Sequence, residues 1–117
     1  MWVMLNDQAP NDPEIDALSD GAFRLWVSAM CYCQAELTDG FVGDQRVRRL
    51  TPRFKPVHLK ELTKPSPNPN GPILQPVGDG YVVRNFKKYN RDAEYWNEQR
   101  RKAAERKAKW REVSQSP

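Results

Sequence analysis

The sequence predicts a mostly α-helical fold with a small β-wing, followed by a charged C-terminal helix. Apolar residues three and four positions apart predict one long core helix that reaches Leu37. Two basic segments behind it predict a pair of short helices, and two apolar segments around residues 78–80, Gly-Asp-Gly, predict a β-hairpin. Because a chain of 117 residues builds one modest core, these elements are expected in a single domain with one appendage.

The N-terminal third is expected to hold two helices. Pro13 suits the first turn of a short helix that runs to about Leu18, with Asp12 as its cap. Ser19 or Asp20 then caps the core helix. The continuous apolar stripe of that helix is Ala22, Leu25, Trp26, Ala29, Met30, Cys33 and Leu37. Its aromatic residues are interpreted as core packing rather than as ligand contacts.

A turn that contains Gly40 is expected to end the core helix, because glycine takes positive φ without steric cost. The next residues, Phe41 and Val42, predict a brief extended segment. Asp44 can then cap a short helix over residues 45–50. The arginines of that helix are expected to face outward and are Arg46, Arg48 and Arg49.

Pro52 breaks this helix, and a second short helix is expected to begin near Pro56. Its apolar residues are Val57, Leu59 and Leu62. Two short helices joined by a tight turn behind a core helix form the skeleton of a helix-turn-helix. The Pro-rich residues that follow predict a loop over 65–72.

The hairpin completes the predicted fold. Its strands flank residues 78–80, and the second strand is expected to run to Phe86. Pro76 restricts the first strand to an edge of the sheet, because proline cannot donate a ladder hydrogen bond. The extended segment behind the core helix would add a small third strand. A hairpin directly after a helix-turn-helix is the element order of a winged helix, so residues 1–90 are predicted to form a winged helix-turn-helix domain.

Residues 91–113 are predicted to form a charged helix. They are rich in helix-forming residues, and Glu98 with Lys102 is one of two four-apart ion pairs in the favourable order. Since apolar residues are sparse, we expect the first turns to dock on the domain and the later part to be solvated. Residues 114–117 are expected to be a disordered end.

Charge is distributed unevenly along the chain. Residues 1–43 hold seven acidic residues against one arginine, whereas residues 44–64 hold seven bases against two acids. Residues 99–111 hold seven further bases against one acid. Two positive blocks behind an acidic front end favour an oriented field that attracts a polyanion. For each block taken alone, the alternative is a solvated charged face.

Composition also argues against several classes of protein. No apolar run approaches the roughly 20 residues that span a bilayer, and the N-terminus lacks the pattern of a secretory signal, so a cytoplasmic protein is expected. Cys31 and Cys33 lie two apart on a predicted helix and diverge, so they are interpreted as reduced, partly buried thiols rather than metal ligands. With no Gly-rich phosphate loop and His58 as the single histidine, we expect no cofactor, no metal and no enzymatic activity.

Two segments resemble a known family. Residues 18–42 begin the core helix with Ser-Asp-Gly-Ala-Phe-Arg-Leu and end it with Leu-Thr-Asp-Gly, and residues 78–100 place Tyr-Asn before a charged helix. They resemble the small winged-helix proteins of actinobacteria and their phages, which are similar to the N-terminal domains of phage replisome organisers and replication initiators. The resemblance implies a winged-helix fold, DNA binding and, for a phage-encoded protein, a place in the host cytoplasm.

The candidate site follows from this fold. In a helix-turn-helix the second short helix enters the major groove, while surrounding bases and the wing contact the DNA backbone. His58, Lys60 and Glu61 are expected on the exposed side of that helix, His58 as a base reader or polar filler and Glu61 as an acceptor from cytosine or a solvated residue. The residues predicted to bind DNA are Arg46, Arg48, Arg49, Arg53, Lys55, His58, Lys60, Lys64, Arg84, Lys87, Lys88, Arg100, Arg101 and Lys102.

The chain is therefore predicted to bind duplex DNA in replication initiation or in transcriptional control, and both roles stay open. The alternative is a protein-interaction module that recruits or inhibits a replication or transcription protein of the host through the winged helix or the tail. The tail, with Trp110 among bases, suits either a partner protein or a second nucleic-acid contact that stacks on single-stranded bases. No coiled-coil heptads are evident, and the oligomeric state stays open.

Overall fold

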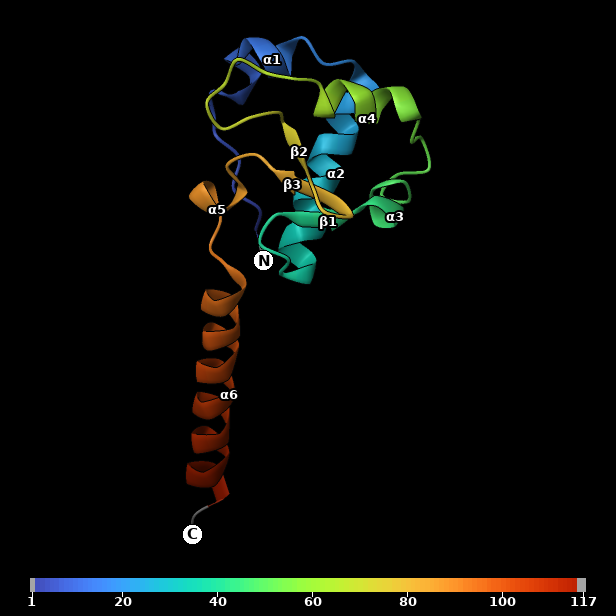
Figure 1. Cartoon of the computed structure of the whole chain (residues 1–117). Helices are drawn as coiled ribbons and strands as arrows, with labels where there is room; N and C mark the ends of the chain where they lie inside the picture. Colours follow the sequence, from blue (N-terminus) through green and yellow to red (C-terminus); the bar gives the residue numbers. More distant parts are fainter. Residues whose placement is uncertain (1, 116–117) are drawn as a thin grey trace.

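The computed structural model describes residues 2–115 and confirms a mostly helical domain with a small three-stranded antiparallel sheet and a long C-terminal helix (Figure 1). In chain order the elements are the 3₁₀ helix η1 (Ala9–Asn11), α1 (Pro13–Asp16), α2 (Asp20–Glu36), β1 (Phe41–Gly43), α3 (Asp44–Val47), α4 (Pro56–Thr63), β2 (Leu74–Val77), β3 (Gly80–Val83), α5 (Phe86–Tyr89) and α6 (Ala93–Gln115). The last helix continues two residues beyond its predicted end at 113. The rest of the predicted disordered end, residues 116–117, lies outside the described part of the chain.

Helix α2 forms the centre of the core, as its apolar stripe predicts. Ser19 caps it, because the Ser19 hydroxyl oxygen accepts a hydrogen bond from the Ala22 amide at 3.2 Å. All predicted stripe residues except Leu37 are buried. Leu37 instead adopts a left-handed conformation with φ of 54° and caps the C-terminus of the helix. The chain then turns through Gly40, whose φ of 97° fits the predicted role of this glycine.

The sheet has the order β1-β3-β2, with both neighbours antiparallel to the central strand β3. Phe41 lies opposite Val82 and Leu74 lies opposite Val83, so the extended segment behind α2 does join the hairpin as a third strand. Pro76 lies on the edge strand β2, as predicted, where its missing amide costs no ladder bond. Buried residues of α2, α4 and the sheet, including Leu25, Leu62 and Leu74, form one hydrophobic cluster.

The predicted boundaries of α3 and β3 are wrong, and so is the predicted burial of one residue of α4. Helix α3 ends at Val47 rather than at residue 50, and Asp44 is its first residue while Gly43 occupies the cap position. On α4, Val57 is not part of the apolar face, since its side chain is 55% exposed. Strand β3 ends at Val83, before the predicted end at Phe86, because a left-handed residue turns the chain and Phe86 begins the unpredicted helix α5.

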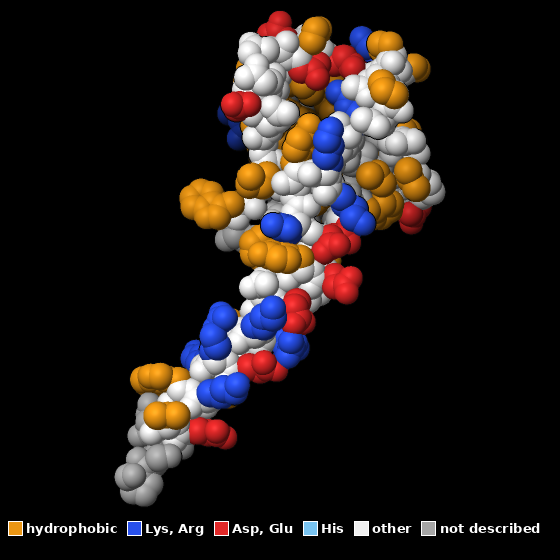
Figure 2. Space-filling model, turned by 90° about the vertical axis from the view of Figure 1, so that its left-hand side faces the viewer, with side chains coloured by type: hydrophobic (Ala, Val, Ile, Leu, Met, Phe, Trp, Pro, Cys, Tyr) orange, Lys and Arg blue, Asp and Glu red, His pale blue; other side chains and the backbone are white. Residues whose placement is uncertain are grey.

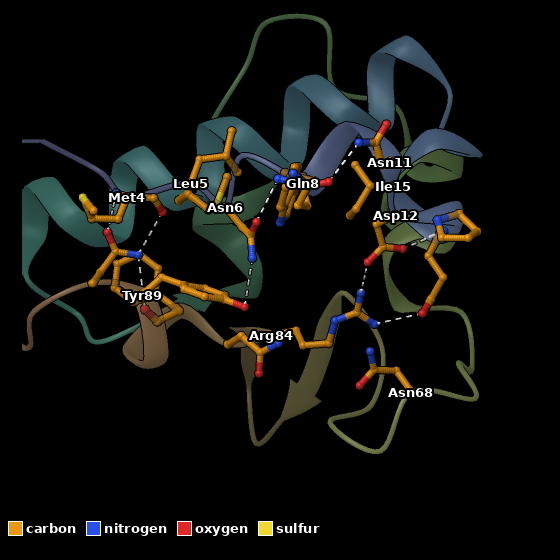
Figure 3. A pocket seen from close by; sticks show the side chains of 18 of the residues that line it. Met4, Leu5, Asn6, Gln8, Asn11, Asp12, Ile15, Asn68, Arg84 and Tyr89 are labelled. Carbon is orange, nitrogen blue, oxygen red and sulfur yellow. Dashed lines mark hydrogen bonds and ion pairs between the residues drawn. The ribbon is translucent and has the colours of Figure 1, made fainter.

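The N-terminal segment crosses the domain and is tied to α2 and α5. The Gln34 side-chain amide donates to the carbonyl oxygen of Trp2 at 3.1 Å. The buried Asn90 side chain accepts from the Met4 amide at 2.6 Å and donates to the Phe86 carbonyl oxygen at 3.2 Å (Figure 3). A cavity of about 600 Å³ lies between this segment, α1 and α5.

Helix α6 leaves the domain and extends away from it (Figure 1), which gives the molecule dimensions of 65 × 28 × 25 Å. Its start is held by the Ala93 amide, which donates to the Asp39 carboxylate at 2.7 Å, and by the half-buried Trp96. Every residue from Arg100 to Val113 is exposed, so the later part of the helix is solvated, as predicted. Among the described residues, none of the helices has the length and apolar character needed to cross a membrane.

Candidate nucleic-acid interface

The bases of residues 44–64 come from α3, from the connection behind it and from α4, which lie on the right-hand side of the domain in Figure 1. Six of these bases are exposed and, among the described side chains, form no ion pair with a carboxylate. We call this set the basic face; it consists of Arg46, Arg49, Arg53, Lys55, Lys60 and Lys64. All six belong to the predicted DNA-binding residues.

The first acid of this stretch, Asp44, is engaged within the protein. Its carboxylate accepts from the Arg48 guanidinium at 3.2 Å and from the Tyr81 hydroxyl at 2.9 Å. These two hydrogen bonds, that of Arg48 first, lower the pKa of Asp44, whereas burial and then the hydrogen bond to Asp44 raise the pKa of Tyr81. Arg48 is therefore largely neutralised by its own neighbour, one turn away, and differs from the six bases of the basic face.

The second acid, Glu61, faces α2 and not the exposed side of α4 on which it was predicted. Its carboxylate accepts from the Ser19 hydroxyl at 2.6 Å and from the Ser19 amide at 3.0 Å. The side-chain bond and then the backbone bond lower the pKa of Glu61. Glu61 thus fixes the start of α2 against α4, and the prediction that it lies free on the exposed side of α4 is wrong.

His58 also faces inward, contrary to the prediction. Its imidazole ring packs against the backbone of Gly21 at the start of α2, so closely that a Cβ atom at position 21 would overlap Cε1 and Nε2 of the ring. Its Nδ1 is buried and has no hydrogen-bond partner among the described residues. On an eight-residue helix whose buried side also contains Leu59 and Leu62, His58 and Glu61 complete the face that contacts the core.

Arg84 was predicted to reach DNA from the wing but is an internal residue. Its side chain is 7% exposed, and its guanidinium forms ion pairs with Glu14 at 3.3 Å and with Asp12 at 4.0 Å. It also donates to the carbonyl oxygen of Gly71 at 3.0 Å. Figure 3 shows Arg84 pointing across the cavity towards Asp12. The arginine therefore joins the end of β3 to α1 and to the Pro-rich loop.

The remaining predicted bases lie on α5 and α6. Lys87 and Lys88 are exposed on α5, and the Lys88 amine lies 5.5 Å from the centre of the Tyr89 ring. On α6, Arg100 and Lys102 are exposed, whereas Arg101 is held between the carboxylates of two glutamates of its own helix, one turn to either side. These residues lie away from the basic face.

A hollow of about 740 Å³ between the start of α3 and the hairpin turn was not predicted. Two bases of the basic face, Arg46 and Arg49, border it together with Tyr32 of α2 and Asp79 of the turn. The Arg46 guanidinium stacks over the Tyr32 ring at 5.5 Å from its centre. Nothing in the local sequence pairs Tyr32 with Arg46, because the fold brings together residues from two helices.

The described residues contain no group of three or more His, Cys, Asp or Glu side chains that could bind a metal. Both cysteines are free; Cys33 is buried and Cys31 is exposed, where both were expected to be partly buried. Burial raises the pKa of the Cys33 thiol, which favours its protonated form.

Comparison of the chain with family models, with curated proteins and with solved structures finds no match. The chemistry of the basic face therefore has to be inferred from its own charges and shape.

Proposed function

We propose that this chain is a winged helix-turn-helix protein that binds duplex DNA through the basic face of α3 and α4. The observation that carries the proposal is that these six exposed bases outnumber the carboxylates beside them. Asp44 is bound by Arg48 and Tyr81, and Glu61 is bound by Ser19, while Asp79 of the hairpin turn is an exposed carboxylate that borders Arg46 and Arg49. Six exposed bases are left with a local excess of positive charge, which attracts phosphates.

The arrangement of the elements supports the proposal. Helix α2, strand β1, helices α3 and α4 and the β2–β3 hairpin follow one another in the order expected of a winged helix. In that arrangement α4 is the helix that enters the major groove. Its exposed side presents Lys60 and the apolar Val57. Lys60 suits contact with a phosphate, and Val57 suits contact with the methyl group of thymine.

Backbone contacts dominate the proposed complex. His58 and Glu61, the two polar residues first considered as base readers, are turned towards α2. The hairpin turn consists of Asp79 and two glycines and contains no Lys or Arg. In the proposed complex the wing therefore orients the domain and makes no charged contact with the phosphates. The hollow beside Arg46 and Arg49 offers a concave surface next to this turn, in which the DNA backbone can lie.

The biological role is part of the proposal. The resemblance of residues 18–42 and 78–100 to winged-helix proteins of actinobacteria and their phages supports a role in replication initiation or transcriptional control, in the cytoplasm of the host cell. Recruitment or inhibition of a host replication or transcription protein is the alternative for the same domain.

Fluorescence anisotropy of a labelled random duplex, titrated from low to physiological salt, tests the proposal. Six phosphate contacts would give a slope of log affinity against log salt of up to about −5, because each releases about 0.9 counterion. Arg49→Gln is expected to reduce the magnitude of that slope by about 0.9. Arg24→Gln, which removes the same charge from the exposed surface of α2 outside the basic face, is the matched control and should leave the slope unchanged.

Two results would contradict duplex binding by this face. One is the absence of duplex binding at low salt, which would shift the proposal to a protein partner. The other is an equal loss of slope in the Arg49→Gln and Arg24→Gln variants, which would indicate attraction by net charge alone.

A further inference from the structure

Helix α6 is a long element that the domain does not need for its core. It has 23 residues, and its hydrophobic residues beyond Trp96 are few, with Trp110 70% and Val113 75% exposed. A helix that is polar on all sides is usually stabilised by its own side-chain pairs or joins two partners. The positions of the charged residues around α6 therefore indicate which of them pair within the helix and which can contact a partner.

The acids of α6 form one stripe. Glu94, Glu98, Glu105 and Glu112 are spaced by four and seven residues, which places them on one side of an α-helix. Arg101 lies between two of them, and its guanidinium is bound by the carboxylates of Glu98 and Glu105. This contact lowers the pKa of Glu98 and raises that of Arg101. The stripe thus supplies the intramolecular pairs that stabilise the helix.

The other bases of α6 form two rows on different sides of the helix. Arg100, Lys107 and Arg111, spaced by seven and four, lie well away from the acidic stripe. Lys102, Arg106 and Lys109 lie on the other flank of the stripe, where the charge of Lys102 also lowers the pKa of Glu98. All six are exposed and form no ion pair among the described side chains. Figure 2 shows Lys and Arg side chains along one edge of α6 and Asp and Glu side chains towards the other. We call the row of Arg100, Lys107 and Arg111 the basic side of α6.

We propose that the basic side of α6 is a second duplex DNA-binding surface, which contacts the phosphate backbone outside the stretch held by α3 and α4. The inference rests on the proposed function for its choice of DNA. From Arg100 to Arg111 this row rises about 16 Å along the helix, so it can follow a DNA backbone over a few phosphates. Because the acids face the other way, the helix can approach DNA without bringing carboxylates to the phosphates.

The sparse apolar surface favours nucleic acid over the other partners of basic helices. A protein partner requires a buried apolar or aromatic centre, and a lipid surface requires an apolar face opposite the bases. On α6 the side opposite the bases carries glutamates, and Trp110 is the one aromatic residue beyond the docked first turn. Charge is therefore the main contribution that α6 offers to binding.

The test compares two kinds of arginine and lysine on the same helix, in the full chain. The variant with Arg100→Gln, Lys107→Gln and Arg111→Gln removes one row, and Arg101→Gln removes the base held by the acidic stripe. Glutamine has nearly the same helix propensity as these residues, and circular dichroism verifies that α6 remains helical. For the random duplex, the triple variant should reduce the magnitude of the salt slope by about 2.7, because each of the three lost phosphate contacts contributes about 0.9.

Lys107→Gln and Arg101→Gln form a pair matched in charge. Lys107→Gln should reduce the slope by about 0.9 and Arg101→Gln should not change it. A slope that is unchanged in the triple variant would overturn the inference. Failure of the proposed function gives a different result. In that case Arg49→Gln leaves the salt slope unchanged, while the α6 variants still reduce it.

Discussion

Gly21→Ala is the substitution that most directly tests how α2 and α4 meet. Alanine is normally the better helix former, and at this position near the helix start the exchange alone would stabilise the protein by about 0.5 kcal/mol, less than the interior value of about 1 kcal/mol. In this fold the new Cβ would overlap three ring atoms of His58, whose side chain lies between the helices. We therefore expect the sign of the effect to be reversed.

The expected magnitude follows from the space available. Forcing one carbon atom into a packed contact typically costs 1–3 kcal/mol, so Gly21→Ala should lower the free energy of unfolding by about 1–2 kcal/mol. When His58→Ala opens the contact first, the same exchange at position 21 should instead raise the free energy of unfolding by about 0.5 kcal/mol. The coupling between the two positions is then about 2 kcal/mol, well above the additivity error of distant sites.

Urea unfolding of the parent, the two single variants and the double variant measures this coupling, with circular dichroism and fluorescence as independent probes of a two-state transition. Equal slopes of free energy against urea in all four proteins are needed for the comparison. If Gly21→Ala stabilises the protein with His58 in place, the imidazole does not occupy the contact. His58 would then be available again as a residue of the DNA-binding side of α4.

Two further predictions concern residues that carry charge inside the fold. Arg84→Met should lower the free energy of unfolding by about 2 kcal/mol, because it removes a side chain that is 7% exposed together with its bonds to Glu14 and to a loop carbonyl. This value is smaller than for a fully buried ion pair, because solvent reaches the Glu14 carboxylate and screens the interaction. The salt slope for duplex DNA should not change, and a lower slope at parental stability would make Arg84 a DNA contact. Glu61→Gln should cost about 1 kcal/mol at pH 7, comparable to the loss of a helix cap, since its carboxylate is bound by Ser19 in a partly exposed position. Because folding lowers the pKa of Glu61, this contribution is present above the unfolded pKa of about 4.3 and is lost as the pH falls through the folded value, so parent and variant should converge in acid. A stability difference that persists unchanged at low pH would contradict that account.

The sequence by itself determined the local elements, because each depends on residues close together in the chain. A capping residue, Ser19 or Asp20, before an apolar stripe predicted the start of α2, and a proline predicted that β2 lies at the edge of the sheet. The distribution of bases also followed from composition, and six of the fourteen predicted DNA-binding residues, those of the basic face, do lie exposed on adjoining elements. Even so, the boundaries of α3 and β3 were missed, and a left-handed residue such as Asn85, which ends β3, leaves little trace in the sequence pattern.

The tertiary structure alone decided which charged and polar side chains are available to a partner. Arg84, His58 and Glu61 are indistinguishable in sequence from exposed helix or strand residues, yet each reaches a group more than ten residues away. The partner of a long side chain depends on which groups lie near it in the folded state and on how far they are desolvated. Neither property can be read from the neighbouring residues in the sequence. On α6 the sequence predicted an ion pair of Glu98 with Lys102, whereas in the structure Arg101 binds both Glu98 and Glu105. The basic face also depends on the fold, because Asp44 and Glu61 are engaged by Tyr81 and Ser19, which are distant in sequence.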